Sequence, residues 1–330
     1  MGNKILIIYP STNRHLGLWD DLINDNRVYL RCSAPKKISK WLKPIRKVHL
    51  STKINQLIKI PNKHYWYEFS DLYELTNHVT QILIIDGALS NIKIDELAYC
   101  RTINPAIKIN LFFLNAIKGE SQIMNEIRTK YENFKWDNIY TFDPLDALNY
   151  QYQYLGFNYY SRKDIKTENI SENEIYFIGG VKGNRTNTII EVFEFLTNNN
   201  VKSKFTLFNS TKTIKHKDIQ YIQDNWISYE EILNNIAKSN CILEILQRNQ
   251  YGATLRYFEA VCYNKKLLTN NPEIINFPFY NSKWMKIFKN IEDIDLDWIH
   301  NKENINYNYK NEFSPKNLIN ILINNSHEEI

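Results

Sequence analysis

Short apolar runs separated by polar, turn-forming segments recur along the whole chain. They cover residues 5–9, 28–31, 82–85, 107–114 and 139–142, and then 174–178, 204–208, 218–222, 241–246 and 266–269. Segments with helical spacing of apolar residues lie between and after them, at 71–80, 94–103, 121–134, 185–197, 229–239, 253–263 and 315–324. Because strand and helix patterns alternate, the sequence predicts parallel sheets covered by helices, an α/β fold.

This alternation is interrupted once, at residues 161–173, which are polar and have no periodicity. The chain has 330 residues, about twice the usual length of one domain. We therefore predict two Rossmann-like domains facing a cleft, with residues 1–160 in the first, 161–173 as a linker and 174–310 in the second. Residues 311–330 are expected to form a helix that packs back on the first domain.

The composition is that of a globular protein, with 43% hydrophobic and 23% charged residues. No apolar run approaches the ~18 residues that span a bilayer, and residues 1–4 lead directly into a strand pattern instead of a secretory signal. The four cysteines are scattered and form no Cys-x-x-Cys pair, which is typical of reduced, partly buried thiols. These features predict a cytoplasmic protein.

Ligands of parallel sheets bind beyond the carboxyl ends of the strands, so the loops there are the first place to look for chemistry. The first such loop in the second half contains Gly179, Gly180, Lys182 and Arg185 and leads into a helix. Glycines allow close approach of the backbone, and the cations can neutralise phosphates. The loop is a candidate diphosphate site, although a tight turn with solvated charges is the alternative.

A second loop of this kind follows the apolar run 241–246. It begins at Gln247, contains Gly252 and Thr254, and continues into a helix with Arg256 and Glu259 on one face. A nucleotide-sugar site needs a cation for the diphosphate, an acceptor for ribose hydroxyls and free backbone N–H groups. These residues can supply all three, and the alternative is an ordinary Arg–Glu pair on a helix surface.

The pattern Gly252-x-Thr254-x-Arg256-x-x-Glu259-Ala260, followed by residues 264–271, resembles the donor-site segment of GT-B glycosyltransferases. Residues 140–147 and 60–66 are also similar to the bacterial group of lipopolysaccharide core or exopolysaccharide biosynthesis. The resemblance implies donor binding by the C-terminal domain and acceptor binding by the N-terminal domain. It also implies that Arg256 and Lys182 hold the diphosphate and that Glu259 holds the ribose.

One departure from that group concerns stereochemistry. Many retaining GT-B enzymes carry a second Glu eight residues before the ribose-binding Glu, and this position is Tyr251 here. The resemblance therefore does not assign a retaining outcome.

The acceptor side offers fewer candidates, all in loops after strands of the first half. A proton acceptor for the acceptor hydroxyl, in an inverting mechanism, is expected among His15, Asp86 and Asp143. Arg14 and Asn115 are further candidates on this side. Each has a local alternative, because Asp86 and Asp143 can cap helices or turns and His15 can be solvated.

No metal or other cofactor is expected. The segment Asp293–Asp297 contains the Asp-x-Asp pattern of GT-A metal sites, but it lies near the C-terminus in a polar stretch and is interpreted as a solvated acidic segment. The seven histidines have no metal-ligand spacing.

The net charge of +5 is unevenly distributed. Residues 31–67 contain ten Lys or Arg and no Asp or Glu. Three interpretations are open: this segment binds an anionic membrane surface, binds an acidic acceptor, or is a solvated loop. A nucleic-acid partner is not expected, because no nucleic-acid module surrounds the segment.

Together these features predict a glycosyltransferase that moves a sugar from a nucleotide-sugar donor to a cell-surface glycan or lipid-linked glycan. The alternative is a non-catalytic protein that binds sugar nucleotides or glycans and retains the fold. A nicotinamide dehydrogenase is disfavoured, since the loop after the first strand lacks the glycine fingerprint.

Overall fold

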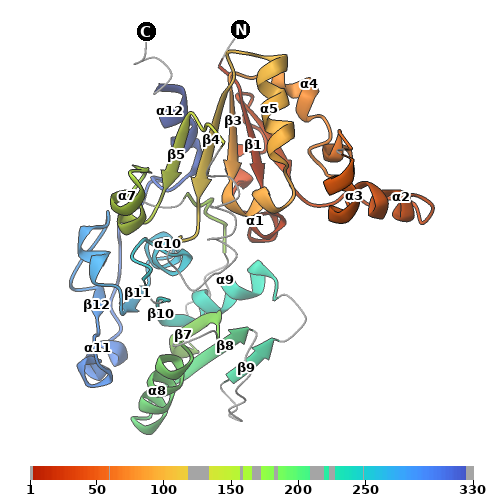
Figure 1. The fold of residues 1–330 in the computed structure, drawn as a ribbon. Helices are drawn as coiled ribbons and strands as arrows, with labels where there is room; N and C mark the ends of the chain where they lie inside the picture. The colour runs from red at the N-terminus through yellow and green to blue at the C-terminus, as the bar shows by residue number, and fades with distance from the viewer. Residues whose placement is uncertain are drawn as a thin grey trace.

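The computed structural model describes residues 3–58, 60–117, 134–156, 159–165, 172–181, 185–208, 219–222, 227–247 and 249–324, with side chains at all of these except 13–15, 221 and 222. Within these residues the chain forms two six-stranded sheets, one in each half, with every pairing parallel (Figure 1). Helices cover both sheets. The predicted α/β class with two Rossmann-like domains is confirmed.

The N-terminal sheet has the strand order β2-β1-β3-β4-β5-β6. Its strands are β1 (Ile5–Tyr9), β2 (Val28–Cys32), β3 (Gln81–Ile85), β4 (Lys108–Phe113), β5 (Asn138–Thr141) and β6 (Gln153–Tyr154). The helices of this domain are α1 (Ser11–Leu16), η1 (Asp20–Leu22), α2 (Leu42–His49), α3 (Thr52–Leu57), η2 (Lys63–Trp66), α4 (Leu72–Thr76), η3 (Asp86–Ser90), α5 (Ile94–Ile103) and α7 (Pro144–Tyr150).

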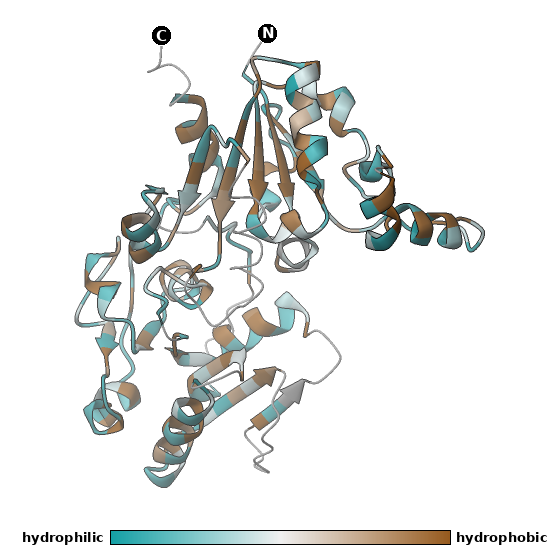
Figure 2. Cartoon of the chain, viewed as in Figure 1, coloured by the Kyte–Doolittle hydropathy of each residue, from teal (hydrophilic) through white to brown (hydrophobic). Residues whose placement is uncertain are grey.

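Alternate side chains of β1 pack on the two faces of this sheet, because successive side chains of a strand point in opposite directions. Leu6 and Ile8 pack in one buried cluster with residues of α4 and α5. Ile5 and Ile7 join a second cluster on the other face, which also contains Trp19 beside η1. Both faces are covered, which explains why the strands read as continuous apolar runs (Figure 2).

The C-terminal sheet has the order β12-β11-β10-β7-β8-β9. Its strands are β7 (Asn173–Gly180), β8 (Ser203–Phe208), β9 (Ile219–Ile222), β10 (Ser239–Glu244), β11 (Lys266–Thr269) and β12 (Met285–Ile287). The helices of this half are α8 (Arg185–Asn198), α9 (Tyr229–Ala237), α10 (Leu255–Cys262), η4 (Pro272–Asn276), η5 (Ile291–Asp293), α11 (Leu296–His300) and α12 (Pro315–Asn324).

The buried clusters show how the two halves are joined. On β7, Phe177 packs with residues of α8 in a cluster that belongs to this domain alone. Tyr176, on the opposite face, packs in the same cluster as Ile5 and Ile7 of the N-terminal sheet. One apolar cluster therefore runs through both domains.

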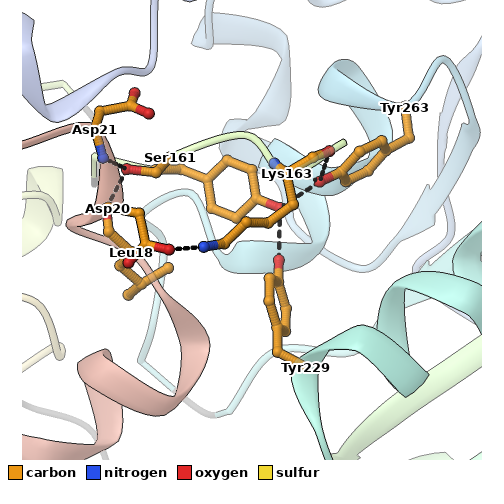
Figure 3. Close-up of polar contacts among 8 residues, drawn as sticks. Leu18, Asp20, Asp21, Ser161, Lys163, Tyr229 and Tyr263 are labelled. Atoms are coloured by element: carbon orange, nitrogen blue, oxygen red, sulfur yellow. Dashed lines mark hydrogen bonds and ion pairs between the residues drawn. The ribbon is translucent and has the colours of Figure 1, made fainter. Parts of the chain in front are cut away.

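Hydrogen bonds from the chain segment after β6 tie the domains together at their junction (Figure 3). The hydroxyl oxygen of Tyr160 lies 2.6 Å from that of Tyr229 and 3.0 Å from that of Tyr263, both in the C-terminal domain. Ser161 Oγ donates to the carbonyl of Leu18 at 2.9 Å, and Lys163 pairs with Asp20. This segment thus contacts both halves of the molecule.

Helix α12 lies beside the N-terminal sheet, although it follows the C-terminal domain in sequence (Figure 1). Gln81 of β3 donates from Nε2 to the carbonyl of Leu322 at 2.8 Å, and Arg27 donates to Asn320 at 2.8 Å. Leu318 is buried in the shared cluster. The chain therefore crosses between the halves twice.

Some elements were not expected from the sequence. Strand β6 is exposed and β12 has only three residues, so neither has a clear apolar pattern. The helices α2 and α3 bury none of their side chains, so the usual sign of an amphipathic core helix does not apply. Most of the helix expected at 121–134 lies outside the described residues.

Candidate active site in the interdomain cleft

The strand order of each sheet reverses at one point, and ligands of such sheets bind there. In the N-terminal sheet the reversal lies between β1 and β3, and in the C-terminal sheet between β7 and β10. Pro10 and Asp86 follow the first pair of strands, and both line a cleft of about 420 Å³. Gly179 and Ile245, at the ends of the second pair, line the same cleft. The two reversal points therefore open into one space between the domains.

Arg185 begins α8 and lines this cleft. Its guanidinium lies over the ring of Phe177, 5.5 Å from the ring centre, and its buried Nε atom has no hydrogen-bond partner in the described part of the chain. Burial, with a smaller contribution from the positive charge of Arg256, lowers the pKa of Arg185 to about 10, while the attraction of the Glu244 carboxylate opposes that change. The group is thus a poorly solvated cation, placed where an anion would improve its surroundings.

Gly179 makes room for this arginine. A Cβ atom at Gly179 would lie 2.7 Å from Nη2 of Arg185, closer than two such atoms can approach. Gly180 has open space on its side-chain side, with no atom within 4 Å of a Cβ placed there. Lys182, the other cation expected in this loop, lies outside the described residues.

Arg256 lies in the first turn of α10 and also lines the cleft, with 12% of its side chain exposed. Its Nη2 donates to Oε1 of Glu259 at 3.0 Å, while its Nη1 lies 3.0 Å from the other carboxylate oxygen. Tyr229 donates its hydroxyl to Oε1 of Glu259, also at 3.0 Å. The Glu259 carboxylate thus fixes the position of the Arg256 guanidinium.

Glu259 itself is completely buried and is not among the residues that line the cleft. Burial raises its pKa to about 7, while the attraction of Arg256 opposes that rise. Its contact with a ribose stays a prediction; in the structure its carboxylate is occupied by Arg256 and Tyr229. The surface Arg–Glu pair that the sequence left as the alternative is therefore a mostly buried pair in the structure.

Glu244 is a cleft residue that the sequence analysis missed. It ends β10, is buried, and accepts hydrogen bonds from the hydroxyls of Thr254 and of Thr269, the latter at 2.5 Å. Burial raises its pKa, and the charges of Arg256 and Arg185 oppose that rise. A lone acidic residue inside the apolar run 241–246 was the available signal, since buried carboxylates in strands are rare.

Asp86 lies across the cleft from the arginines, at the end of β3. Asn115 donates from Nδ2 to its Oδ2 at 2.9 Å, and the N–H of Gly87 donates to Oδ1 at 2.7 Å. Burial raises the pKa of Asp86 to about 6, against the lowering effect of these hydrogen bonds. Both Asp86 and Asn115 line the cleft, so the N-terminal wall presents a carboxylate that changes protonation near neutral pH.

Asp143, another candidate proton acceptor, has a structural role. Its Oδ1 caps α7 by accepting from the N–H groups of Leu145 and Asp146, at 2.9 and 3.3 Å. Its Oδ2 accepts from the N–H groups of Tyr251 and Gly252 in the other domain, at 2.8 and 2.9 Å. The carboxylate is fully buried, and its hydrogen bonds hold the domains together. For Asp143 this geometry supports the role of a helix cap, which was the alternative to that of a proton acceptor.

Gly252 is part of the same contact between domains. Its N–H group is bonded to Asp143, and it does not line the cleft, whereas Gln250 and Ala253 do. A role for Gly252 in donor binding stays a prediction, and in this structure its backbone lies close to Phe142. A Cβ at Gly252 would lie 2.4 Å from two ring atoms of Phe142 and 2.9 Å from its carbonyl oxygen.

We therefore expect Gly252→Ala to destabilise the protein by about 1–3 kcal/mol, the usual cost of inserting a methyl group into a packed contact. Urea unfolding of the variant and the parent measures the difference. Gly180→Ala is the matched control, because a Cβ there meets no other atom within 4 Å. Equal stability of Gly252→Ala and the parent would contradict this account of the domain contact.

The remaining predicted residues fall into two groups. Gln247 and Thr254 line the cleft together with Arg185 and Arg256. The side chains of Arg14 and His15 are not described, although both residues lie in α1, which follows β1.

In the described part of the chain, no group of three or more His, Cys, Asp and Glu side chains could hold a metal ion. Asp295, in the acidic segment, pairs with Lys286 and caps α11 by accepting from the N–H of Trp298 at 2.9 Å.

No family model matches this chain, and a search of curated proteins finds no match. Among solved structures it is similar to the apo form of the lipopolysaccharide outer core galactosyltransferase WaaB, at 12% identity and a TM-score of 0.47 over 88% of this chain and 87% of that one. It is also similar to an alpha-glucosyltransferase in complex with UDP and DNA, at 13% identity and a TM-score of 0.47 over 82% and 79% of the two chains. A third is the glycosyltransferase SnogD from Streptomyces nogalater, at 10% identity and a TM-score of 0.40 over 82% of each chain. Likenesses this distant assign neither family nor substrate, so the functional assignment rests on the geometry of the cleft.

Proposed function

We propose that the protein is a metal-independent glycosyltransferase that moves a sugar from a nucleotide-sugar donor onto a cell-surface glycan, such as lipopolysaccharide, capsule or exopolysaccharide. The observation that supports this most is the pair of arginines, Arg185 and Arg256, which line one wall of the cleft opposite the buried carboxylate of Asp86.

The arginines would hold the diphosphate of the donor. The two guanidinium groups repel each other, the carboxylate of Glu244 opposes that repulsion at Arg185, and a bound diphosphate would add further negative charge beside both arginines. Guanidinium groups also match phosphate oxygens with paired hydrogen bonds. Helix α8 begins at the cleft, so its dipole adds positive potential at the same place.

Asp86 would act as the proton acceptor. It would take the proton of the acceptor hydroxyl while that oxygen forms a bond to the anomeric carbon of the donor sugar. The bond from that carbon to the diphosphate would break, and the departing diphosphate would carry the electron pair. The arginines would stabilise the negative charge that develops there. A base facing the leaving group from across the cleft corresponds to an inverting displacement.

We place the protein in the cytoplasm, where nucleotide sugars are made, with its glycan acceptor carried on a lipid at the inner face of the membrane. No helix in the described ranges is long and apolar enough to cross a bilayer. Attachment to the membrane would then be peripheral.

A panel of nucleotide sugars and nucleoside diphosphates tests the donor assignment by thermal shift, since a ligand at 100 times its Kd stabilises by about 2.7 kcal/mol. Hydrolysis or transfer of the stabilising donor then tests catalysis. Stabilisation by none of these ligands would contradict the proposal. Binding without turnover would favour the alternative of a non-catalytic binding protein.

We also expect EDTA to leave the rate of transfer unchanged, because Arg185 and Arg256 supply the positive charge that a metal ion would otherwise provide. The rate with EDTA, compared with the rate in added Mg²⁺ or Mn²⁺, is the measurement. A rate that falls at least tenfold with the chelator and returns with the metal would show that the arginines are not sufficient.

A further inference from the structure

Helices α2 and α3 form a hairpin that projects from the N-terminal domain (Figure 1). Neither helix has a buried residue. Helices of 8 and 6 residues gain little stability from intrinsic propensity, and an amphipathic helix is normally stabilised by burying its apolar face. The hairpin therefore has an apolar face that the rest of the described chain does not cover.

Residues 41–58, which contain the hairpin, carry an unusual share of the exposed apolar surface. Six of the twelve large apolar side chains that are exposed in the described ranges lie within these 18 residues. They are Trp41 (87% exposed), Leu57 (87%), Ile58 (68%), Ile45 (56%), Val48 (52%) and Leu42 (40%). Brown apolar bands mark both helices in Figure 2. Concentrated apolar patches of this kind mark interaction surfaces.

The same hairpin is cationic. It lies within residues 31–67, which hold ten Lys or Arg and no acidic residue. Lys43 and Lys47 are exposed on α2, between its apolar positions. The hairpin is anchored to the domain by polar contacts at its base, where Trp66 donates to Nδ1 of His49 at 2.8 Å and the Nε2 of His49 lies 2.8 Å from the carbonyl oxygen of Pro61.

We propose that the α2–α3 hairpin binds the surface of an anionic lipid bilayer. Trp41 and Leu57 enter the boundary between headgroups and acyl chains, and Lys43 and Lys47 contact lipid phosphates from the flanks. Interfacial helices combine these two features, an apolar face and a lysine-rich polar face. The long stems of the lysines can lie along apolar surface while their ammonium groups reach the headgroups.

Two other partners fit the hairpin less well. A nucleic acid would use the cations but would leave the exposed Leu57, Ile58 and Val48 without contacts, since such interfaces are polar and dominated by phosphates. A second copy of the chain would cover the apolar residues but would bring two cationic hairpins together. An anionic bilayer satisfies both the charge and the apolar face.

Membrane binding through the hairpin would also orient the cleft, and this consequence rests on the proposed function. The hairpin belongs to the N-terminal domain, which also carries Asp86, so membrane binding would hold the acceptor side of the cleft near a lipid-linked glycan. The binding itself does not depend on transferase activity, and the two can be tested separately.

The experiment is flotation of the purified protein with vesicles of phosphatidylcholine alone or mixed with phosphatidylglycerol. We expect binding to the anionic vesicles only. The double variant Lys43→Gln/Lys47→Gln should bind roughly 30-fold more weakly at low salt, about fivefold for each lysine, and the deficit should shrink as salt rises. Trp41→Ser/Leu57→Ser should bind at least about tenfold more weakly at every salt concentration, because apolar burial is not screened.

Matched controls remove the same kinds of side chain elsewhere. Leu148→Ser takes away an apolar side chain that is 79% exposed on α7, and Lys289→Gln/Lys302→Gln takes away two exposed lysines. Both should float like the parent, and all variants should keep the parent's thermal stability and nucleoside diphosphate affinity.

Three results would overturn the proposal. One is equal flotation of the hairpin variants and the controls. Another is binding to duplex DNA, lost in the lysine variant, without binding to vesicles. The third is a dimer, seen by analytical ultracentrifugation, that the Trp41→Ser/Leu57→Ser variant dissociates while vesicle binding is absent.

Discussion

The Asp86→Asn variant should lose about 10²- to 10⁴-fold in turnover, the usual contribution of a positioned proton acceptor, and should keep its affinity for the donor nucleotide. The amide keeps the shape of the side chain but cannot accept the hydroxyl proton. The arginines on the opposite wall are unchanged, so nucleotide binding measured by calorimetry should match the parent.

The pH profile gives this prediction a second readout. Because burial raises the pKa of Asp86 to about 6, its carboxylate is mostly protonated below that pH and ionised above it. The value of kcat/KM should therefore rise about tenfold per pH unit below pH 6 and level off above it. A base with the ordinary aspartate pKa, about 3.9, would give a flat profile from pH 5 to 8.

Two further variants separate chemistry from folding. Asn115→Ala removes a hydrogen bond that lowers the pKa of Asp86, so the inflection of the profile should move to higher pH. Asp71→Asn is a control with the same chemical change, at a partly exposed carboxylate paired with Arg31 on the outside of the domain. Turnover of Asp86→Asn within a factor of three of the parent would remove Asp86 from the mechanism.

The second large effect is expected at the donor site. Arg256→Ala should weaken nucleoside diphosphate binding by about 1.5–3 kcal/mol, the range for hydrogen bonds to a charged group. That corresponds to roughly 10- to 150-fold in Kd. Arg185→Ala should weaken binding by a similar factor, because its guanidinium lines the same wall. Calorimetry with the nucleoside diphosphate selected by thermal shift measures both.

Glu259→Gln shows whether the buried carboxylate acts through Arg256 or touches the ribose. If it positions Arg256, the variant should weaken binding of inorganic pyrophosphate and of the nucleoside diphosphate by the same factor. If it contacts ribose, only the nucleoside diphosphate should be affected. Glu259→Gln combined with Arg256→Ala completes a double-mutant cycle, and a coupling energy near zero would mean that the two side chains act independently.

Unchanged diphosphate affinity in both Arg256→Ala and Arg185→Ala would contradict the donor-site assignment. The arginines would then be structural, and the diphosphate would bind elsewhere. Lys289→Gln, at an exposed lysine in the C-terminal domain, serves as the control for a general loss of positive charge.

The alternation of apolar runs and helical spacing was enough to predict two parallel sheets and most of their strands. The signal is local, because a strand buried on both faces must be apolar along its length wherever it lies in the sheet. The same local reasoning placed Arg185 in a loop after one strand and Arg256 in the helix that follows the loop after another, and the rule for parallel sheets brought those loops to one edge. Both arginines line the cleft.

What the tertiary structure decided is which polar side chains face the cleft and which are used to hold the molecule together. Asp86 and Asp143 both follow strands, yet one lines the cleft and the other binds Tyr251 and Gly252, more than a hundred residues away. Glu259 is buried and pairs with Arg256, whereas Glu244, at the end of an apolar strand, lines the cleft. Periodicity reports on neighbours within a few residues, whereas these roles depend on contacts between distant parts of the chain, which are set only when the two domains pack.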